Sequence, residues 1–180
     1  MFNKIVCFTL TFVCIATFGC TATHSPIQAN GELEFGRYLF MAPEGYWYFP
    51  KKYPATFKTS KDIFLITFWK DKEALSRKNA KEIGVFINFA VSPNTYKNFE
   101  TYYIAAKELG IKYEELPEEA FMLKTIANWS CKQTGQGVFG IECTSLGDDL
   151  VTFGVYGNDK GIVMSNVSLL QRMLESFKVQ

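Results

Sequence analysis

The chain has 180 residues, of which 48% are hydrophobic, 16% aromatic and 21% charged. This composition is typical of a globular domain and excludes the disordered and collagen-like classes. The 19 basic and 18 acidic residues nearly cancel. Because nucleic-acid binding needs an excess of basic charge, we expect no nucleic-acid partner. The one histidine, His24, precedes the expected domain, which excludes histidine-based catalysis and the usual zinc sites within it.

The amino terminus has the pattern of an export signal. Residues 1–4 carry one lysine, and the 15 residues from Ile5 to Gly19 carry no charge. A helix rises about 1.5 Å per residue, so this run is too short for a hydrocarbon core of about 30 Å. A cleaved secretory signal therefore fits better than a membrane span.

The end of this run, Phe18-Gly19-Cys20, resembles the cleavage site of bacterial lipoprotein signals. The resemblance implies that residues 1–19 are removed as a signal peptide and that a palmitate-containing lipid is attached at Cys20. Residues 20–34 then form a flexible tether, and residues 35–180 form a single globular domain. Ordinary secretory cleavage near Ala22 or Ala29, and retention of the run as an anchor, are the alternatives.

Two cysteines of the domain, Cys131 and Cys143, lie in the segment CKQTGQGVFGIEC. Its glycine-rich centre predicts a hairpin turn, and a turn near Gly137 places the two cysteines opposite each other. Export puts them in an oxidising compartment, so we predict a structural disulfide bond between them. Free thiols are the alternative, because the spacing is not that of a redox or metal motif.

The remaining elements follow from periodicity and turn residues. Aromatic and β-branched runs predict strands at residues 37–50 (with a turn at 43–45), 63–69, 83–91, 124–132, 138–144, 150–156 and 161–165. Helical spacing of apolar residues predicts helices from 92 to 110 and from 167 to 177, and the polar segment 70–82 can hold a short helix. Strands in hairpins with helices between and after them indicate an α+β domain, an antiparallel sheet flanked by helices.

Four consecutive aromatic residues, Tyr46, Trp47, Tyr48 and Phe49, form the candidate partner-binding surface. In an extended segment two of them face inward and two outward, which leaves an apolar rim for a protein or glycan partner. The acidic segment around Pro117 is expected to be a solvated turn, since its spacing is not that of a calcium loop. We predict no metal site, no cofactor and no catalytic residue.

The motif F-x-x-P-x-G at Phe40 to Gly45 and the closing LLQRMLESFKV resemble the PsbP-like superfamily, which includes small DcrB-like bacterial lipoproteins. The resemblance implies an α/β/α sandwich that serves as a binding or assembly module and carries no shared catalytic residues. The expected function is that of a non-catalytic lipoprotein of the bacterial cell envelope. Its lipid holds it to the membrane, its domain faces the periplasm or the exterior, and it binds a protein partner. A periplasmic immunity or inhibitor lipoprotein and an envelope hydrolase are the alternatives.

Overall fold

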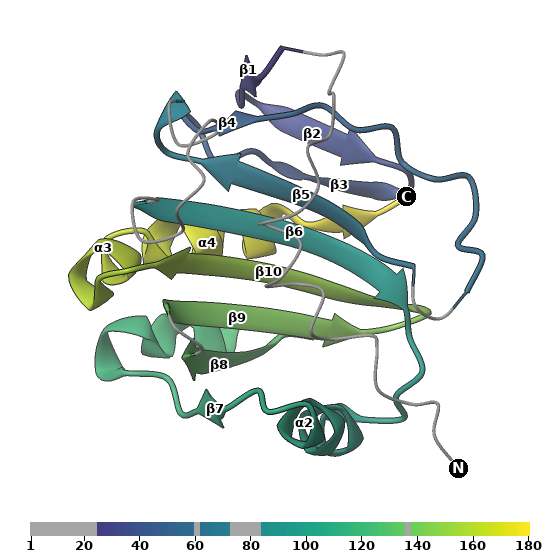
Figure 1. Cartoon of the computed structure of the whole chain (residues 1–180), viewed down its shortest axis with the longest axis vertical. Helices are drawn as coiled ribbons and strands as arrows, with labels where there is room; N and C mark the ends of the chain where they lie inside the picture. The colour runs from purple at the N-terminus through teal and green to yellow at the C-terminus, as the bar shows by residue number, and fades with distance from the viewer. Residues whose placement is uncertain (1–24, 60–61, 73–83, 136–137) are drawn as a thin grey trace.

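The computed structural model describes residues 25–59, 62–72, 84–135 and 138–180, and it shows a mixed α+β domain dominated by a large antiparallel sheet (Figure 1). The predicted signal peptide, Cys20, the turn at Gly137 and most of the predicted short helix within 70–82 lie outside these residues. Within them, no helix has the length and hydrophobicity needed to cross a membrane.

The large sheet has eight strands, and their order across the sheet differs from their order in the chain. From one edge to the other they are β1 (Ile27–Gln28), β4 (Trp47–Tyr48), β5 (Phe64–Trp69), β6 (Val85–Pro93), β10 (Asp149–Gly157), β9 (Phe139–Leu146), β8 (Ser130–Gly135) and β7 (Tyr113–Glu114). A second sheet of three strands comprises β11 (Lys178–Val179), β3 (Tyr38–Met41) and β2 (Glu32–Phe35). The helices are α2 (Phe99–Glu108), the 3₁₀ helix η3 (Glu118–Thr125), α3 (Lys160–Met164) and α4 (Val167–Ser176).

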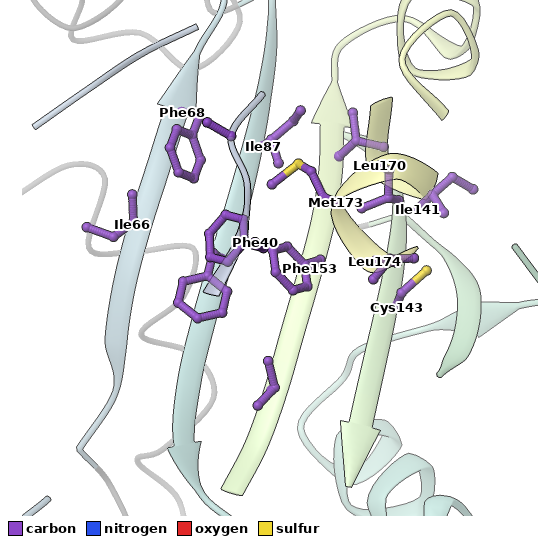
Figure 2. Packing of buried hydrophobic residues seen from close by; sticks show 14 of the residues in the cluster. Phe40, Ile66, Phe68, Ile87, Ile141, Cys143, Phe153, Leu170, Met173 and Leu174 are labelled. Atoms are coloured by element: carbon purple, nitrogen blue, oxygen red, sulfur yellow. The ribbon is translucent and has the colours of Figure 1, made fainter. Parts of the chain in front are cut away.

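Alternation along the strands separates the two faces of the large sheet. In β5, Phe64, Ile66 and Phe68 are buried, whereas the residues between them are half-buried. We call the face of these buried residues the inner face, and it is covered by α4 and the three-stranded sheet. Figure 2 shows side chains of the sheet and of α4 converging there. Helix α4 presents Leu170, Met173 and Leu174, the helical spacing that the sequence predicts.

An aromatic cluster joins the three-stranded sheet to the inner face. The ring of Phe40 on β3 lies 4.8 Å from that of Phe89 on β6 and 4.9 Å from that of Phe153 on β10, measured between centroids. The rings of Phe89 and Phe153 are 5.0 Å apart. All three side chains are fully buried. This cluster is the centre of the core.

The strand predicted at 124–132 is wrong over most of its length, because residues 118–125 form η3 and β8 begins only at Ser130. Pro117 precedes the helix, and Ala120 and Leu123 are its buried residues. Their separation of three residues is one turn of a 3₁₀ helix. The buried residues of this segment therefore recur once per turn and do not alternate, and Phe121 and Met122 between them are exposed.

The strand predicted at 161–165 is also wrong, because residues 160–164 form α3. The side chain of Asp159 accepts a hydrogen bond from the backbone N–H of Ile162 at 3.0 Å, which is the geometry of a helix N-cap. The sequence Gly157-Asn158-Asp159 is typical of a turn, but here its Asp159 starts a helix. Val163 is its buried residue.

The first predicted helix begins later than expected, and the folded part begins earlier. Strand β6 continues to Pro93, and α2 starts after Asn98, which forms a capping box with Thr101. At the amino end, the sequence predicts that the domain begins at residue 35. Strand β1 lies before this residue, β2 begins before it, and Ala29 is buried. Much of the predicted tether therefore belongs to the domain.

Candidate binding site at the amino-terminal edge

The described part of the chain enters the domain at one edge of the large sheet, where β1 pairs with β4. The backbone N–H of Ala29 donates to the carbonyl of Tyr46 at 2.6 Å, and that of Ala42 donates to the carbonyl of Gly31 at 2.8 Å. These bonds hold the turn between β3 and β4 against the entering chain. We call β1, β4 and this turn the amino-terminal edge.

The predicted aromatic rim lies on this edge and divides as an extended segment should. Tyr46 and Tyr48 are buried in the core, whereas Trp47 and Phe49 are half-buried. The hydroxyl of Tyr46 donates to Oδ1 of Asn166, just before α4, at 2.7 Å. Burial raises the pKa of Tyr46 to about 12. Two of the four residues thus anchor the segment in the core, and the other two remain partly exposed.

Trp47 stands at the end of an aromatic row on the outer face. The strand register places Trp47, Trp69, Phe86 and Tyr156 directly opposite one another on β4, β5, β6 and β10. The ring centroids of Trp69 and Phe86 are 5.1 Å apart, and those of Phe86 and Tyr156 are 5.3 Å apart. The ammonium of Lys72 lies 4.6 Å from the centroid of the Trp47 ring. This distance allows a cation–π interaction.

A groove of about 460 Å³ lies between the amino-terminal edge and α4. The backbone N–H of Met41 at the end of β3 donates to Oγ of Ser176 at 2.9 Å, which fixes the distance between strand and helix. We call this cavity the α4 groove. Its lining residues are Asn30, Gly31, Met41, Ala42, Glu44, Leu169, Arg172, Met173, Glu175 and Ser176.

The α4 groove combines apolar and charged side chains. Met41, which is 42% exposed, and the half-buried Leu169 give it apolar surface, whereas Met173 is fully buried behind them. Glu44, Arg172 and Glu175 are also part of the lining, and all three are exposed. This groove could not be predicted, because no pattern in the sequence shows that β3 lies beside α4. The one indication is that Met41 follows the inward-facing Phe40, so its own side chain is expected to face away from the core.

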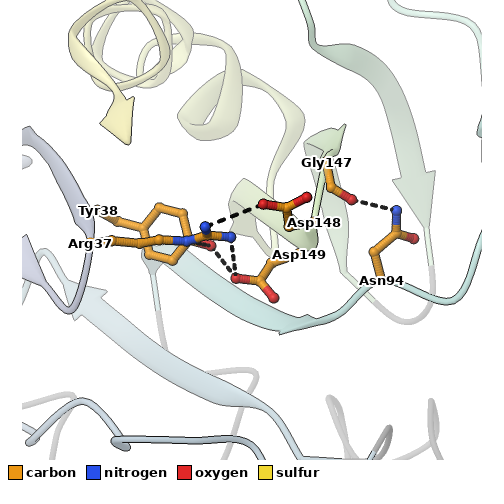
Figure 3. A network of polar contacts seen from close by, with 6 residues as sticks. All are labelled: Arg37, Tyr38, Asn94, Gly147, Asp148 and Asp149. Carbon is orange, nitrogen blue, oxygen red and sulfur yellow. Dashed lines mark hydrogen bonds and ion pairs between the residues drawn. The ribbon is translucent and has the colours of Figure 1, made fainter. Parts of the chain in front are cut away.

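Arg37 joins the three-stranded sheet to the turn between β9 and β10 (Figure 3). Its guanidinium donates to Asp149 at 3.0 Å and to Asp148 at 3.4 Å, and the hydroxyl of Tyr38 donates to Asp149. Burial, and then the hydrogen bond to Asp149, raise the pKa of Tyr38. Since the guanidinium bridges both carboxylates and the Tyr38 hydroxyl adds a further bond to Asp149, we interpret this network as a structural link between the sheets.

On the outer face, the carboxylate of Glu142 accepts hydrogen bonds from three tyrosines. The hydroxyls of Tyr156 and Tyr102 lie 2.8 Å and 3.2 Å from it, and that of Tyr113 also donates to it. The ring of Tyr156 lies close over the backbone of Gly140 and Gly154, where a Cβ atom would come within 2.5 Å and 2.3 Å of its atoms. Three donors satisfy the carboxylate without a cation, so this cluster too is structural.

The tyrosines around Glu142 predict how stability depends on alkaline pH. Burial first, and then the charge of Glu142, raise the pKa values of Tyr102, Tyr113 and Tyr156 above the ordinary value of 10.0. The unfolded chain loses these protons near pH 10 while the folded chain keeps them. We therefore expect the free energy of unfolding to be constant with respect to these groups below about pH 10 and to fall above it. Spectrophotometric titration combined with denaturation measures this, and ionisation of all tyrosines near pH 10 in the folded protein would contradict it.

The cysteine pair lies where the equal spacing about the turn predicts. Cys131 on β8 is directly opposite Cys143 on β9, and their sulfur atoms are 2.09 Å apart, which is disulfide distance. Both side chains are buried on the inner face. The described residues hold no group of three or more His, Cys, Asp or Glu side chains that could bind a metal ion.

No protein-family model matches this chain, and no curated protein sequence matches it.

Proposed function

We propose that this chain is a non-catalytic lipoprotein of the bacterial cell envelope whose domain serves as a binding or assembly module of the PsbP-like kind. Support for the fold comes from the large antiparallel sheet with α4 against its inner face, and from the position of the F-x-x-P-x-G motif. Its Phe40 fills the centre of the core, and its Gly45, with φ of 80°, forms the turn before β4. A lipid on Cys20 would hold this domain at the membrane.

The observation that carries the binding function is the α4 groove, in which apolar and charged side chains lie between the turn before β4 and helix α4. Protein-binding surfaces commonly combine an apolar centre with a polar rim. The exposed Met41 and the half-buried Leu169 provide the apolar centre, with the exposed charged residues as the rim. Methionine side chains adapt their shape to a partner. We propose that the groove receives an apolar side chain of a protein partner.

Site-specific photo-cross-linking of the full chain in its envelope tests this proposal. A photo-reactive amino acid at Met41 should form one dominant adduct with a protein partner, and the additional substitution Arg172→Glu should reduce its yield about tenfold through the reversed charge. The matched control is the same amino acid at Ile104, which is 53% exposed on α2, and it should form no such adduct.

Identical adducts from positions 41 and 104, or an adduct that is insensitive to Arg172→Glu, would overturn the assignment of the α4 groove. A single enzyme as the adduct of position 41 would specify the immunity or inhibitor form of the binding function.

A further inference from the structure

We propose that the amino-terminal edge docks on the anionic headgroup layer of the membrane, with Trp47 and Ile27 in the interface and Lys70 and Lys72 beside the lipid phosphates. This inference rests on the proposed attachment of a lipid at Cys20. It adds an orientation of the domain and a lipid contact to that proposal.

The chain between Cys20 and the fold is short. Ile27 is already paired with Tyr48 in the large sheet, so seven residue steps separate the lipid from β1. Even a fully extended chain spans at most about 25 Å over that number of steps. The tether predicted from the sequence, to residue 34, would span about twice as much. The short connection keeps the amino-terminal edge close to the bilayer.

The order of strands gives the two edges of the large sheet opposite charge. The described residues from 42 to 72 include five lysines against two aspartates and Glu44, and these lysines are Lys51, Lys52, Lys58, Lys70 and Lys72. Residues 108 to 119 include five glutamates and one lysine, and these glutamates are Glu108, Glu114, Glu115, Glu118 and Glu119.

The first of these segments carries β4 and β5 and the second carries β7, and Figure 1 shows them toward opposite ends of the large sheet. An anionic membrane attracts the basic edge and repels the acidic edge. The charge distribution therefore orients the domain in the same sense as the short connection to Cys20.

The exposed side chains at the amino-terminal edge are of types that suit a membrane interface. Ile27 is 44% exposed, and Trp47 is half-buried with the ammonium of Lys72 4.6 Å from its ring. Tryptophan is enriched where a membrane meets water, and lysine combines an apolar stem with a charged end that reaches phosphates. Residue types that suit the interface thus lie at the edge that the short connection keeps close to the bilayer.

Vesicle binding tests the surface without the lipid anchor. The probe is the full chain carrying Cys20→Ala, with vesicles of phosphatidylcholine alone or mixed with phosphatidylglycerol. We expect Lys70→Glu with Lys72→Glu to weaken binding to the anionic vesicles about tenfold or more. The matched control is Lys107→Glu with Lys112→Glu, which makes the same change of charge on exposed residues outside this edge and should bind within about twofold of the parent chain. Residues 1–19 are common to all variants, so their contribution cancels.

A second readout reports the position of Trp47. Brominated phospholipids should quench tryptophan fluorescence in the parent chain, and most of the quenching should disappear in Trp47→Phe. Thermal unfolding checks that each variant is folded. Equal vesicle binding by both lysine pairs, or unchanged quenching in Trp47→Phe, would overturn the proposal. So would loss of a protein adduct in Trp47→Phe with vesicle binding intact, because the edge would then be a protein site. Absence of lipid on Cys20 is measured separately and would instead remove the proposed anchor.

Discussion

Replacing Phe153 by alanine should lower the free energy of unfolding by about 3–5 kcal/mol, the usual cost of removing a fully buried aromatic ring. Phe153 is 0% exposed on β10, at the centre of the inner face. Its ring lies 4.9 Å from Phe40, 5.0 Å from Phe89 and 5.5 Å from Trp129, measured between centroids. The cavity would therefore open between the two sheets, where rigid strands on both sides limit relaxation.

The matched control is Phe121→Ala. Phe121 is 44% exposed on η3, and its ring contacts the ammonium of Lys124 at 4.2 Å. An exposed cation–π contact contributes about 1 kcal/mol or less, so this variant should remain close to wild type. Denaturant unfolding with the disulfide intact measures both. A loss below about 1 kcal/mol for Phe153→Ala would show that the cluster of Phe40, Phe89 and Phe153 is not the centre of the core.

The elements with a clear period could be predicted from the sequence. Strand β5 alternates buried and half-buried residues over its whole length, and α4 repeats its buried residues at helical spacing. In these elements a single face decides the structure, so the pattern is sufficient. The disulfide distance of Cys131 and Cys143 follows in the same way from their equal spacing about a turn.

The two wrong strands show where periodicity fails. Residues 118–125 contain only two buried residues, one 3₁₀ turn apart, and α3 is a five-residue helix with one buried residue. Segments this short bury too few side chains to show a period. In α3 the deciding interaction is the N-cap by Asp159. The pair Asn158-Asp159 is also typical of turns, so the sequence alone does not distinguish the two structures.

The candidate site could be predicted only in part. The alternation of Tyr46 to Phe49 follows from the pleat of an extended segment, and it divides these residues as expected. The α4 groove depends on β3 lying beside α4, and the charged edges depend on the order of strands in the sheet. Both are long-range arrangements, and the sequence shows the lysines and glutamates without showing that they lie at opposite edges.

Replacing Cys20 should have an all-or-none effect on membrane anchoring through the lipid. The thiol is the attachment point in the lipoprotein reading of Phe18-Gly19-Cys20, so no other side chain of the exported chain substitutes for it. Stable anchoring needs more than one weak signal. Loss of the lipid should remove the covalent anchor and leave the charged contact of the amino-terminal edge, which high salt weakens.

Metabolic labelling with a palmitate analogue tests this claim most directly, with Cys14→Ala as the matched control in the same apolar run. Label is expected on the wild type and on Cys14→Ala, and none on Cys20→Ala. Equal label on the wild type and on Cys20→Ala, or no label on either, would contradict it.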